Sequence, residues 1–232
     1  MRRADIIRHR FRLVHLRFDS AIRREFPGLV TLAFEIEGVT VEERSDELER
    51  FKTDSMRRLR ERYQLESLKD VPPLRAYRDF FWRVGIDPTK TRPASEALLR
   101  RVIQGKELPR INTLVDSYNI ASMEMMVPLA VFDASKLEGD LTMRMAVAGE
   151  RFMGIGMAAE DILSGKEVVI QDGRGLVAIY PYRDADPSKV TTDTKGVNVL
   201  VCGVPGVPSE LLDIATVISS EYIMKFCGGI LH

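Results

Sequence analysis

The 232-residue chain carries 34 Lys and Arg residues against 34 Asp and Glu residues, so its formal net charge is zero, and 45% of its residues are hydrophobic. This composition indicates a soluble, compact protein that is long enough for a real core. No apolar run approaches the length that spans a bilayer, and the arginine-rich N-terminus lacks the apolar core of a secretory signal. We therefore expect a cytoplasmic protein with no membrane partner.

Hydrophobic periodicity and end signals predict the secondary structure along the chain. Ser45 is the expected N-cap of the first helix, Gly85 the C-cap of the second and Ser95 the N-cap of the third. In chain order, the predicted elements are a strand over 29–39, a helix from 46 that includes Tyr63, helices over 74–84 and 96–103, a helix around 111–125, strands over 141–146, 168–171, 176–180 and 197–202, and a helix over 209–226.

Helices mixed with strands in no strict alternation predict an α+β fold, with a mixed or antiparallel sheet flanked by helices. We expect a single domain over residues 1–232. Within it, an N-terminal α/β elaboration over approximately 1–85 is expected to pack on a core over approximately 92–226. No internal repeat and no low-complexity linker marks a boundary.

The segment 108–133 contains the helix that is most informative about function. Its apolar residues follow helical spacing and predict one buried stripe, formed by Ile111, Leu114, Val115, Tyr118, Ala121, Ser122 and Met125. Asp116 and Asn119 lie on the neighbouring face, three residues apart, so a carboxylate and an amide meet on the helix surface. Two interpretations remain open: the pair binds a polar ligand, or it holds a neighbouring loop through backbone hydrogen bonds.

The same segment carries a family resemblance. The order R-I-N-x-L-V-D-x-x-N over 110–119, followed by Pro128, an aliphatic residue and Phe132-Asp133, resembles the B3/B4 domain of the bacterial-type phenylalanyl-tRNA synthetase beta subunit. The resemblance continues through 137–150 and, more loosely, to Cys202. It implies a B3/B4-like fold for roughly the last two thirds of the chain.

In the synthetase this domain is the editing site, which hydrolyses tyrosine wrongly esterified to the phenylalanine tRNA. A chain of 232 residues has no room for a class II catalytic domain, so this one resembles a free-standing relative and not a full synthetase. The resemblance implies a hydrolase that acts in trans on an aminoacyl-tRNA made elsewhere. Such second-site hydrolysis exists because a binding pocket alone separates similar side chains poorly.

The chain departs from the family pattern at two places. In the synthetase pattern P-M-H-A-F-D a histidine contributes to the editing pocket, and Ala130 stands at that place here. The family's glycine-rich stretch ending in Glu is replaced around 182–186. There, either Asp184 or Asp186 is the expected stand-in for the glutamate.

Ester hydrolysis needs a positioned water, a group that orients or deprotonates it, and donors for the developing oxyanion. The candidate catalytic residues are Asp116, Asn119, Glu150 and Asp184. The candidate substrate-binding residues are Asn112, Tyr118, Ala130, Arg183, Asp186, Thr191 and Thr192. We expect no cofactor and no metal, because the sequence has no phosphate-binding glycine loop, no serine-hydrolase elbow and no zinc-ligand spacing.

Two patches of the sequence are basic, one before Phe26 and one that contains Arg57, Arg58 and Arg60. The second is the candidate RNA-binding surface, because arginine neutralises backbone phosphates without reading sequence. The alternative is a solvated helix face, since acidic residues flank the patch. Cys202 and Cys227 are expected to be free buried thiols.

Two functions therefore compete. The first is a trans-editing factor that hydrolyses a mischarged aminoacyl-tRNA with an activated water. The second is a non-catalytic module that binds RNA, tRNA or a small ligand and kept the fold without the chemistry. tRNA or aminoacyl-tRNA is the expected partner in the first case. The sequence leaves the oligomeric state, the amino acid and the tRNA open.

Overall fold

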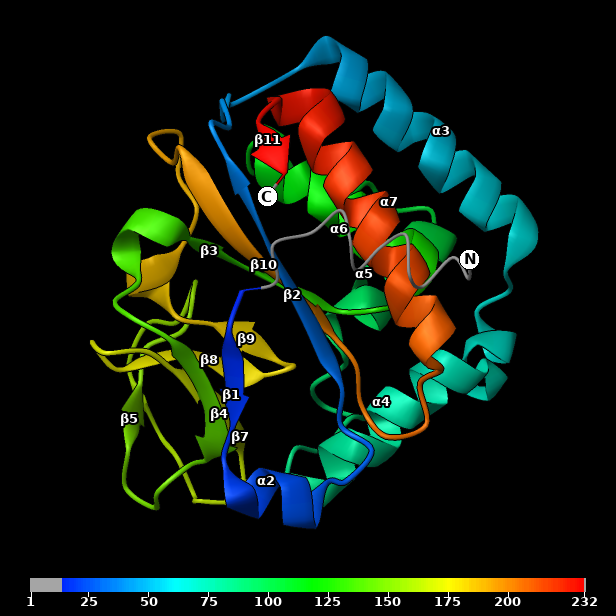
Figure 1. Ribbon diagram of the computed structural model, residues 1–232. Helices are drawn as coiled ribbons and strands as arrows, with labels where there is room; N and C mark the ends of the chain where they lie inside the picture. The colour runs from blue at the N-terminus through cyan, green and yellow to red at the C-terminus, as the bar shows by residue number, and fades with distance from the viewer. Residues whose placement is uncertain (1–13, 232) are drawn as a thin grey trace, which may run out of the picture.

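The computed structural model describes residues 14–231 and consists of two main sheets and a layer of helices (Figure 1). The helices are α2 (Ser20–Glu25), α3 (Asp46–Arg62), α4 (Pro72–Arg83), α5 (Ala94–Ile103), α6 (Thr113–Met125) and α7 (Ser209–Cys227). Short 3-10 turns are η1 (Glu66–Asp70), η2 (Ala134–Lys136) and η3 (Asp186–Ser188). Within 14–231, no helix is long and apolar enough to cross a membrane.

The four-stranded sheet runs through the middle of the molecule in the order β11-β2-β10-β3, and all its pairs are antiparallel. Its strands are β2 (Thr31–Glu37), β3 (Leu129–Asp133), β10 (Gly196–Cys202) and β11 (Ile230–Leu231). Strand β10 pairs with β2 on one side and with β3 on the other, so β3 is an edge strand. Figure 1 shows helices α6 and α7 on one side of this sheet and α3 farther out.

The five-stranded sheet lies on the other side, in the order β1-β4-β7-β8-β9. Its strands are β1 (Leu16–Phe18), β4 (Leu141–Met145), β7 (Val168–Gln171), β8 (Leu176–Tyr180) and β9 (Arg183–Asp184). Strand β1 pairs with β4 in parallel and the other pairs are antiparallel, so the sheet is mixed. A separate hairpin joins β5 (Arg151–Phe152) to β6 (Asp161–Ile162). The predicted α+β class with a mixed sheet and flanking helices is confirmed.

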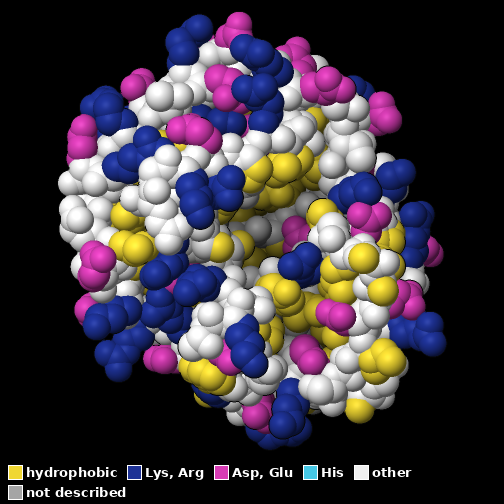
Figure 2. All heavy atoms as spheres, turned by 180° about the vertical axis from the view of Figure 1, so that it is seen from behind, with side chains coloured by type: hydrophobic (Ala, Val, Ile, Leu, Met, Phe, Trp, Pro, Cys, Tyr) yellow, Lys and Arg dark blue, Asp and Glu magenta, His cyan; other side chains and the backbone are white. Residues whose placement is uncertain are grey.

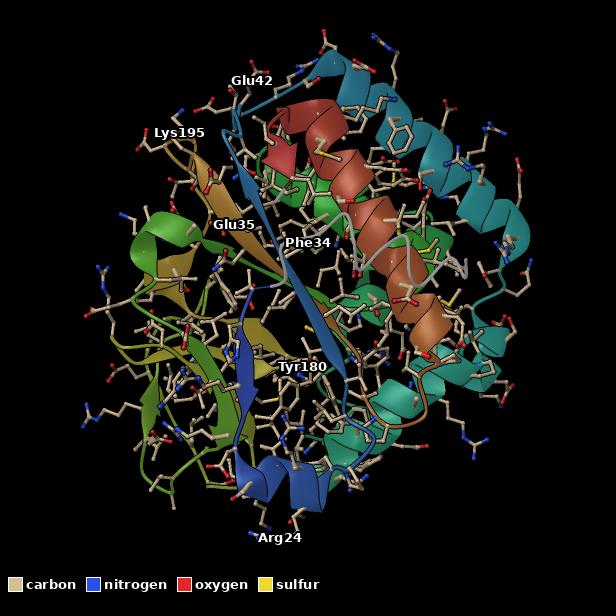
Figure 3. The ribbon with its side chains drawn as sticks, viewed as in Figure 1. Arg24, Phe34, Glu35, Glu42, Tyr180 and Lys195 are labelled. Carbon is tan, nitrogen blue, oxygen red and sulfur yellow. The ribbon has the colours of Figure 1, made fainter. Side chains whose placement is uncertain are left out.

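The two sheets share a core that also receives helix α4. Buried aromatic rings from α4 (Tyr77 and Phe80), from β3 (Phe132) and from β8 (Tyr180) meet there. Tyr180, labelled in Figure 3, lies between the sheets: its hydroxyl pairs with Thr31 Oγ1 at 2.8 Å and donates to the Gly203 carbonyl at 2.6 Å. Burying these rings and satisfying their hydroxyls fixes the two sheets relative to each other.

Several boundaries differ from the prediction for local reasons. Helix α5 begins at Ala94 with Pro93 at the N-cap, and Ser95 is buried inside the first turn instead of capping it. Ile111, predicted on the buried stripe, is 55% exposed, because Asn112 caps α6 and Ile111 precedes the helix. Ser45 does cap α3, since its side chain accepts the Leu48 N–H at 3.4 Å.

The predicted N-terminal elaboration contributes to both sheets. Strand β1 adds to β4, and β2 lies between β11 and β10 with seven paired residues along β10. Of the three buried residues of β2, Phe34 and Ile36 pack into the core under α7, and Ala33 belongs to the core shared by the two sheets. Cys202 and Cys227 are buried and free, as predicted.

Candidate functional site

A pocket of about 200 Å³ opens where helix α6 faces the junction of the two sheets. Its walls come from α6, from β3, from the end of β8 with the following turn, and from β9 and β10. Figure 2 shows a hollow in the middle of this face, with hydrophobic side chains on its walls. The pocket is smaller than the roughly 300–1,000 Å³ of sites for drug-sized ligands, so its size suits a group such as a single amino-acid side chain.

Asp184, on β9, is the acidic residue of this pocket. Its Oδ2 accepts the Val131 N–H at 3.2 Å, which satisfies a donor that the edge strand β3 leaves free. Burial raises the pKa of the Asp184 carboxyl to about 7, and the hydrogen bond from Val131 opposes this only in part. A carboxyl that titrates near neutral pH is well placed to accept and return a proton.

Helix α6 presents Tyr118 and Asn119 to the pocket. Burial, followed by the charges of Asp184 and Asp116, raises the pKa of the Tyr118 hydroxyl well above its ordinary value, so this group stays protonated. The half-buried Asn119 amide has no hydrogen-bond partner among residues 14–231. An amide that is free at a pocket wall can donate to, or accept from, a bound ligand.

Arg183 adds a guanidinium that is held in place. It donates to the Ile155 carbonyl at 2.8 Å and to the Tyr182 hydroxyl at 3.3 Å, and it lies 5.0 Å from the centroid of the Tyr182 ring. Gly154 makes room for it, because a Cβ at this glycine would overlap Arg183 Cδ. The guanidinium is thus held at the pocket wall by the Ile155 carbonyl and the Tyr182 side chain.

Apart from Tyr180 and Tyr182, the rest of the lining is small or apolar. Ala130, at the place of the family histidine, is 6% exposed and faces the pocket together with Leu129, Ala178 and Cys202. The Tyr180–Pro181 peptide bond is cis and forms the turn that leads from β8 to β9. Ala94, Ile155 and Cys202 also line the pocket, and no sequence spacing links these distant positions to it.

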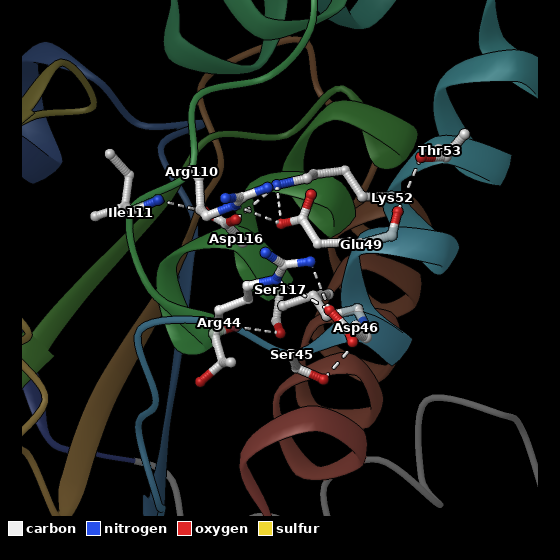
Figure 4. A network of polar contacts seen from close by, with 12 residues as sticks. Arg44, Ser45, Asp46, Glu49, Lys52, Thr53, Arg110, Ile111, Asp116 and Ser117 are labelled. Carbon is white, nitrogen blue, oxygen red and sulfur yellow. Dashed lines mark hydrogen bonds and ion pairs between the residues drawn. The ribbon is translucent and has the colours of Figure 1, made fainter.

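Asp116 is placed elsewhere, in a buried ion pair between α6 and α3 (Figure 4). Its Oδ2 lies 2.7 Å from Lys52 Nζ, its Oδ1 accepts the Ile111 N–H at 3.1 Å, and the residue is 3% exposed. Lys52 also binds Glu49, which in turn binds Arg110. Burial lowers the pKa of Lys52, but the hydrogen bonds and charges of Asp116 and Glu49 outweigh it, so this pKa lies above its ordinary value.

Other predicted residues also have partners outside the pocket. Glu150 accepts two hydrogen bonds from Arg144, which lower its pKa, and Asn112 caps α6 by accepting the Val115 N–H at 2.9 Å. Asp186 pairs with Lys189 on the surface. Thr191 and the exposed Thr192 lie in the loop before β10, which does not line the pocket. Of the two expected stand-ins for the family glutamate, Asp184 lines the pocket and Asp186 does not.

The arginines predicted to bind RNA are engaged by neighbouring groups. Arg57 pairs with Asp54 and Glu61 along α3, Arg58 pairs with Glu124, and Arg60 donates to the Val102 carbonyl and lies 3.5 Å from Glu107. Much of their charge is therefore neutralised locally. In the first basic patch, the arginines at positions 2, 3, 8, 10 and 12 lie outside the described residues. Among residues 14–231, no group of three His, Cys, Asp or Glu side chains is arranged to hold a metal ion.

A two-sheet α+β domain with a small pocket at the sheet junction thus defines the class of this protein. The model of the B3/4 domain matches residues 76–222, which is more than half of the chain, and the chain belongs to this family. The resemblance inferred from the sequence is confirmed.

Two individual relatives agree with this assignment. The phenylalanine–tRNA ligase beta subunit of Corynebacterium efficiens is 33% identical over 113 residues, which cover 49% of this chain and 13% of that protein. The same subunit of Bartonella quintana is 41% identical over 142 residues, covering 51% and 18%. The chain therefore spans less than a fifth of the length of these two relatives.

A solved N-terminal fragment of the phenylalanyl-tRNA synthetase beta-subunit from Pyrococcus horikoshii aligns with 92% of this chain and 49% of its own, at 15% identity and a TM-score of 0.49.

Proposed function

We propose that the protein is a trans-editing factor that hydrolyses the ester of a mischarged aminoacyl-tRNA in the pocket around Asp184. The observation that carries the proposal is a carboxyl with a pKa of about 7 in a pocket of amino-acid size, which is also lined by the Asn119 amide, without a hydrogen-bond partner among residues 14–231. Membership of the B3/4 family, with relatives named as phenylalanine–tRNA ligase beta subunits, supports an aminoacyl-tRNA as the substrate.

The reaction can be written with these residues. The Asp184 carboxylate takes a proton from a water molecule, and the oxygen of this water bonds to the ester carbonyl carbon. Asn119 N–H donates to the oxyanion that forms on the carbonyl oxygen, and the Tyr118 hydroxyl is a second available donor. The ester C–O bond then breaks, and the proton held by Asp184 passes to the ribose oxygen that leaves. The products are the free amino acid and the tRNA.

The amino acid side chain is expected to occupy the apolar part of the pocket. Ala130, Ala178 and Leu129 provide contacts without polar groups there. A site of this kind accepts a side chain by shape and excludes larger ones, and it discriminates by only about 1–3 kcal/mol per methylene. Because Ala130 replaces the family histidine, we expect a side-chain preference that differs from that of the synthetase.

The test is deacylation of a panel of correct and mischarged aminoacyl-tRNAs by the purified protein. Turnover of a mischarged species that falls at least about 100-fold in Asp184→Ala and Asn119→Ala supports the proposal, by the magnitude usual for a lost base or oxyanion donor. Asp186→Ala is the matched control, since this aspartate lies two residues away and outside the pocket.

One observation favours a second function, a non-catalytic module that binds RNA, tRNA or a small ligand. The alanine at position 130 leaves the pocket without the imidazole that contributes to the editing pocket of the family. If the protein binds tRNA or an amino acid but no ester is cleaved faster than in buffer, this second function replaces the first.

A further inference from the structure

Two hollows of about 780 and 340 Å³ adjoin on the surface formed by α4, α5 and the loop between them. They share Arg92 and Arg100 as a common wall. Figure 2 shows lysine and arginine side chains gathered at the lower left of the face that carries the central hollow. After the half-turn from Figure 1, this is the side of α4. We call the two hollows together the α4–α5 groove.

A buried carboxylate organises the arginines of the groove. Glu96, in the first turn of α5, is 0% exposed and holds Arg78 through both of its oxygens. The nearest guanidinium nitrogens of Arg92 and Arg100 lie 3.8 and 3.7 Å from the same carboxylate. One negative charge therefore faces three positive charges. Within the described residues Arg92 and Arg100 form no other ion pair, so the cluster of Glu96 and three arginines carries an excess of two positive charges.

The charge is of one sign in the smaller of the two hollows. The smaller hollow is lined by five basic side chains and by no acidic one: Lys90, Arg92, Arg100, Arg101 and Lys106. The larger hollow has carboxylates on the wall made by η1 and α4, which leaves the positive potential on the α5 side. A concave surface lined by one sign of charge concentrates ligands of the opposite sign. This pattern contrasts with the paired arginines of α3.

An exposed aromatic ring completes the surface. Trp82, on α4, is 56% exposed, lines the larger hollow and is the only tryptophan of the chain. An unpaired base can stack on a large, solvent-exposed aromatic ring that lies near arginines. Such stacking contributes about 1–3 kcal/mol per base in proteins that bind single strands. Phosphates on the arginines and a base on Trp82 are therefore compatible with a single-stranded nucleic acid.

The groove and the pocket approach each other at the start of α5. Ala94 lines the pocket around Asp184, and Arg92 lies only two residues before it. Two residues span at most about 7 Å of extended chain, so the backbone of Arg92 lies near the wall of the pocket. A strand whose terminal ribose lies at the pocket can thus place its preceding phosphates on Arg92 and Arg100.

We infer that the α4–α5 groove binds the sugar–phosphate backbone of a single-stranded RNA end, with Arg92 and Arg100 on the phosphates and Trp82 under a base. The inference rests on the proposed function, which makes this RNA the 3′ end of a tRNA. It assigns RNA binding to α4 and α5 rather than to Arg57, Arg58 and Arg60.

Binding of uncharged tRNA, followed through the fluorescence of Trp82, tests the inference without any hydrolysis. Quenching of Trp82 at low salt is expected, together with at least about a tenfold rise in Kd for the variant R92Q/R100Q. The logarithm of the association constant falls as the logarithm of the salt concentration rises. This slope should become less negative by about 0.7 for each phosphate that the variant no longer binds. Because Arg100 lies against the buried Glu96, the surface variant K90Q/K106Q serves as a second test that leaves this ion pair intact, and it should weaken binding in the same direction.

The matched control is R57Q/R58Q, which removes two arginines that already have acidic partners and should change the Kd less than twofold. An unchanged Kd in both groove variants, or no binding of tRNA to the native protein, overturns the inference. The pocket variant Asp184→Asn should bind tRNA normally. Binding through the groove without ester hydrolysis would reject the editing function and keep the groove, whereas hydrolysis with an unchanged KM in R92Q/R100Q would reject the groove alone.

Discussion

The Asp184 carboxyl accepts the backbone N–H of Val131 at 3.2 Å, and this hydrogen bond joins the last strand of the five-stranded sheet to the edge strand of the four-stranded sheet. The same carboxyl lines the pocket and is buried enough that its pKa rises to about 7. Ionising this carboxyl therefore lowers the stability of the folded protein as the pH rises toward 7.

The first prediction concerns this cost. Asp184→Asn keeps an oxygen for the Val131 N–H and removes the charge, so we expect the free energy of unfolding at pH 8 to rise by about 1–3 kcal/mol, since one pKa unit corresponds to about 1.4 kcal/mol. The folded pKa lies above the ordinary value of 3.8. Between these two values the folded state binds more protons, so the native protein loses stability as pH rises toward 7. Urea unfolding at pH 4 and pH 8 should show the difference only at the higher pH.

The second prediction concerns the pH dependence of deacylation. If Asp184 acts as the base, kcat/KM should increase tenfold per pH unit below about 7 and become constant above it, because the free enzyme must carry the carboxylate. Rates must be corrected for the spontaneous hydrolysis of the ester in buffer at each pH. A profile with no inflection near 7, or the same inflection in Asp184→Asn, would assign the base to another group.

The third prediction concerns the buried pair of Lys52 and Asp116. Lys52→Met leaves the Asp116 carboxylate buried without its cation, and we expect a loss of about 3–5 kcal/mol in the free energy of unfolding. The double variant K52M/D116N should recover part of that loss, since the unpaired charge is gone. Arg44→Gln breaks an exposed pair and should cost less than about 1 kcal/mol. Equal effects of Lys52→Met and Arg44→Gln would contradict the structure.

The fourth prediction concerns Gly154, which has no Cβ and so leaves space for the Arg183 side chain. A Cβ at this position would overlap Arg183 Cδ, so Gly154→Ala should displace the guanidinium from the Ile155 carbonyl. We expect a fall in deacylation of about tenfold and a loss of stability of about 1–3 kcal/mol from overpacking. Arg183→Gln should reduce deacylation equally without the loss from overpacking. A double variant that is no slower than either single one would show that both act through Arg183.

Much of the fold was predictable because its longer elements carry strong local signals. The strands 168–171 and 176–180 have the predicted bounds, since their runs of apolar residues end at polar or turn residues. Strand β3 and the two-residue strands β9 and β11 were missed. A two-residue segment is too short for a periodic pattern, and the five-residue apolar run of β3 cannot be told from a buried helix segment by periodicity alone.

The candidate site was predictable only in part. Tyr118, Asn119, Ala130, Arg183 and Asp184 line one pocket, and their roles in binding or catalysis stay predictions. Helical spacing placed Asp116 beside Asn119, but it carries no information about Lys52, which precedes Asp116 by 64 residues and covers it. Glu96 was not a candidate either: helical spacing places Arg100 four residues after it, but only the fold brings Arg78 to its carboxylate.

The position of β2 has a practical consequence for any excised fragment. A piece limited to the family match, 76–222, would lack both β2 and β11, so β10 would keep β3 as its single neighbour. The exposed side of β10 would then present a row of unpaired N–H and C=O groups, with the buried valines of this strand beside it. Edges of this kind recruit strands from other molecules. The transferable unit for recombinant work or fusion proteins is therefore larger than the family match, and it extends back at least to residue 31 and forward to residue 231.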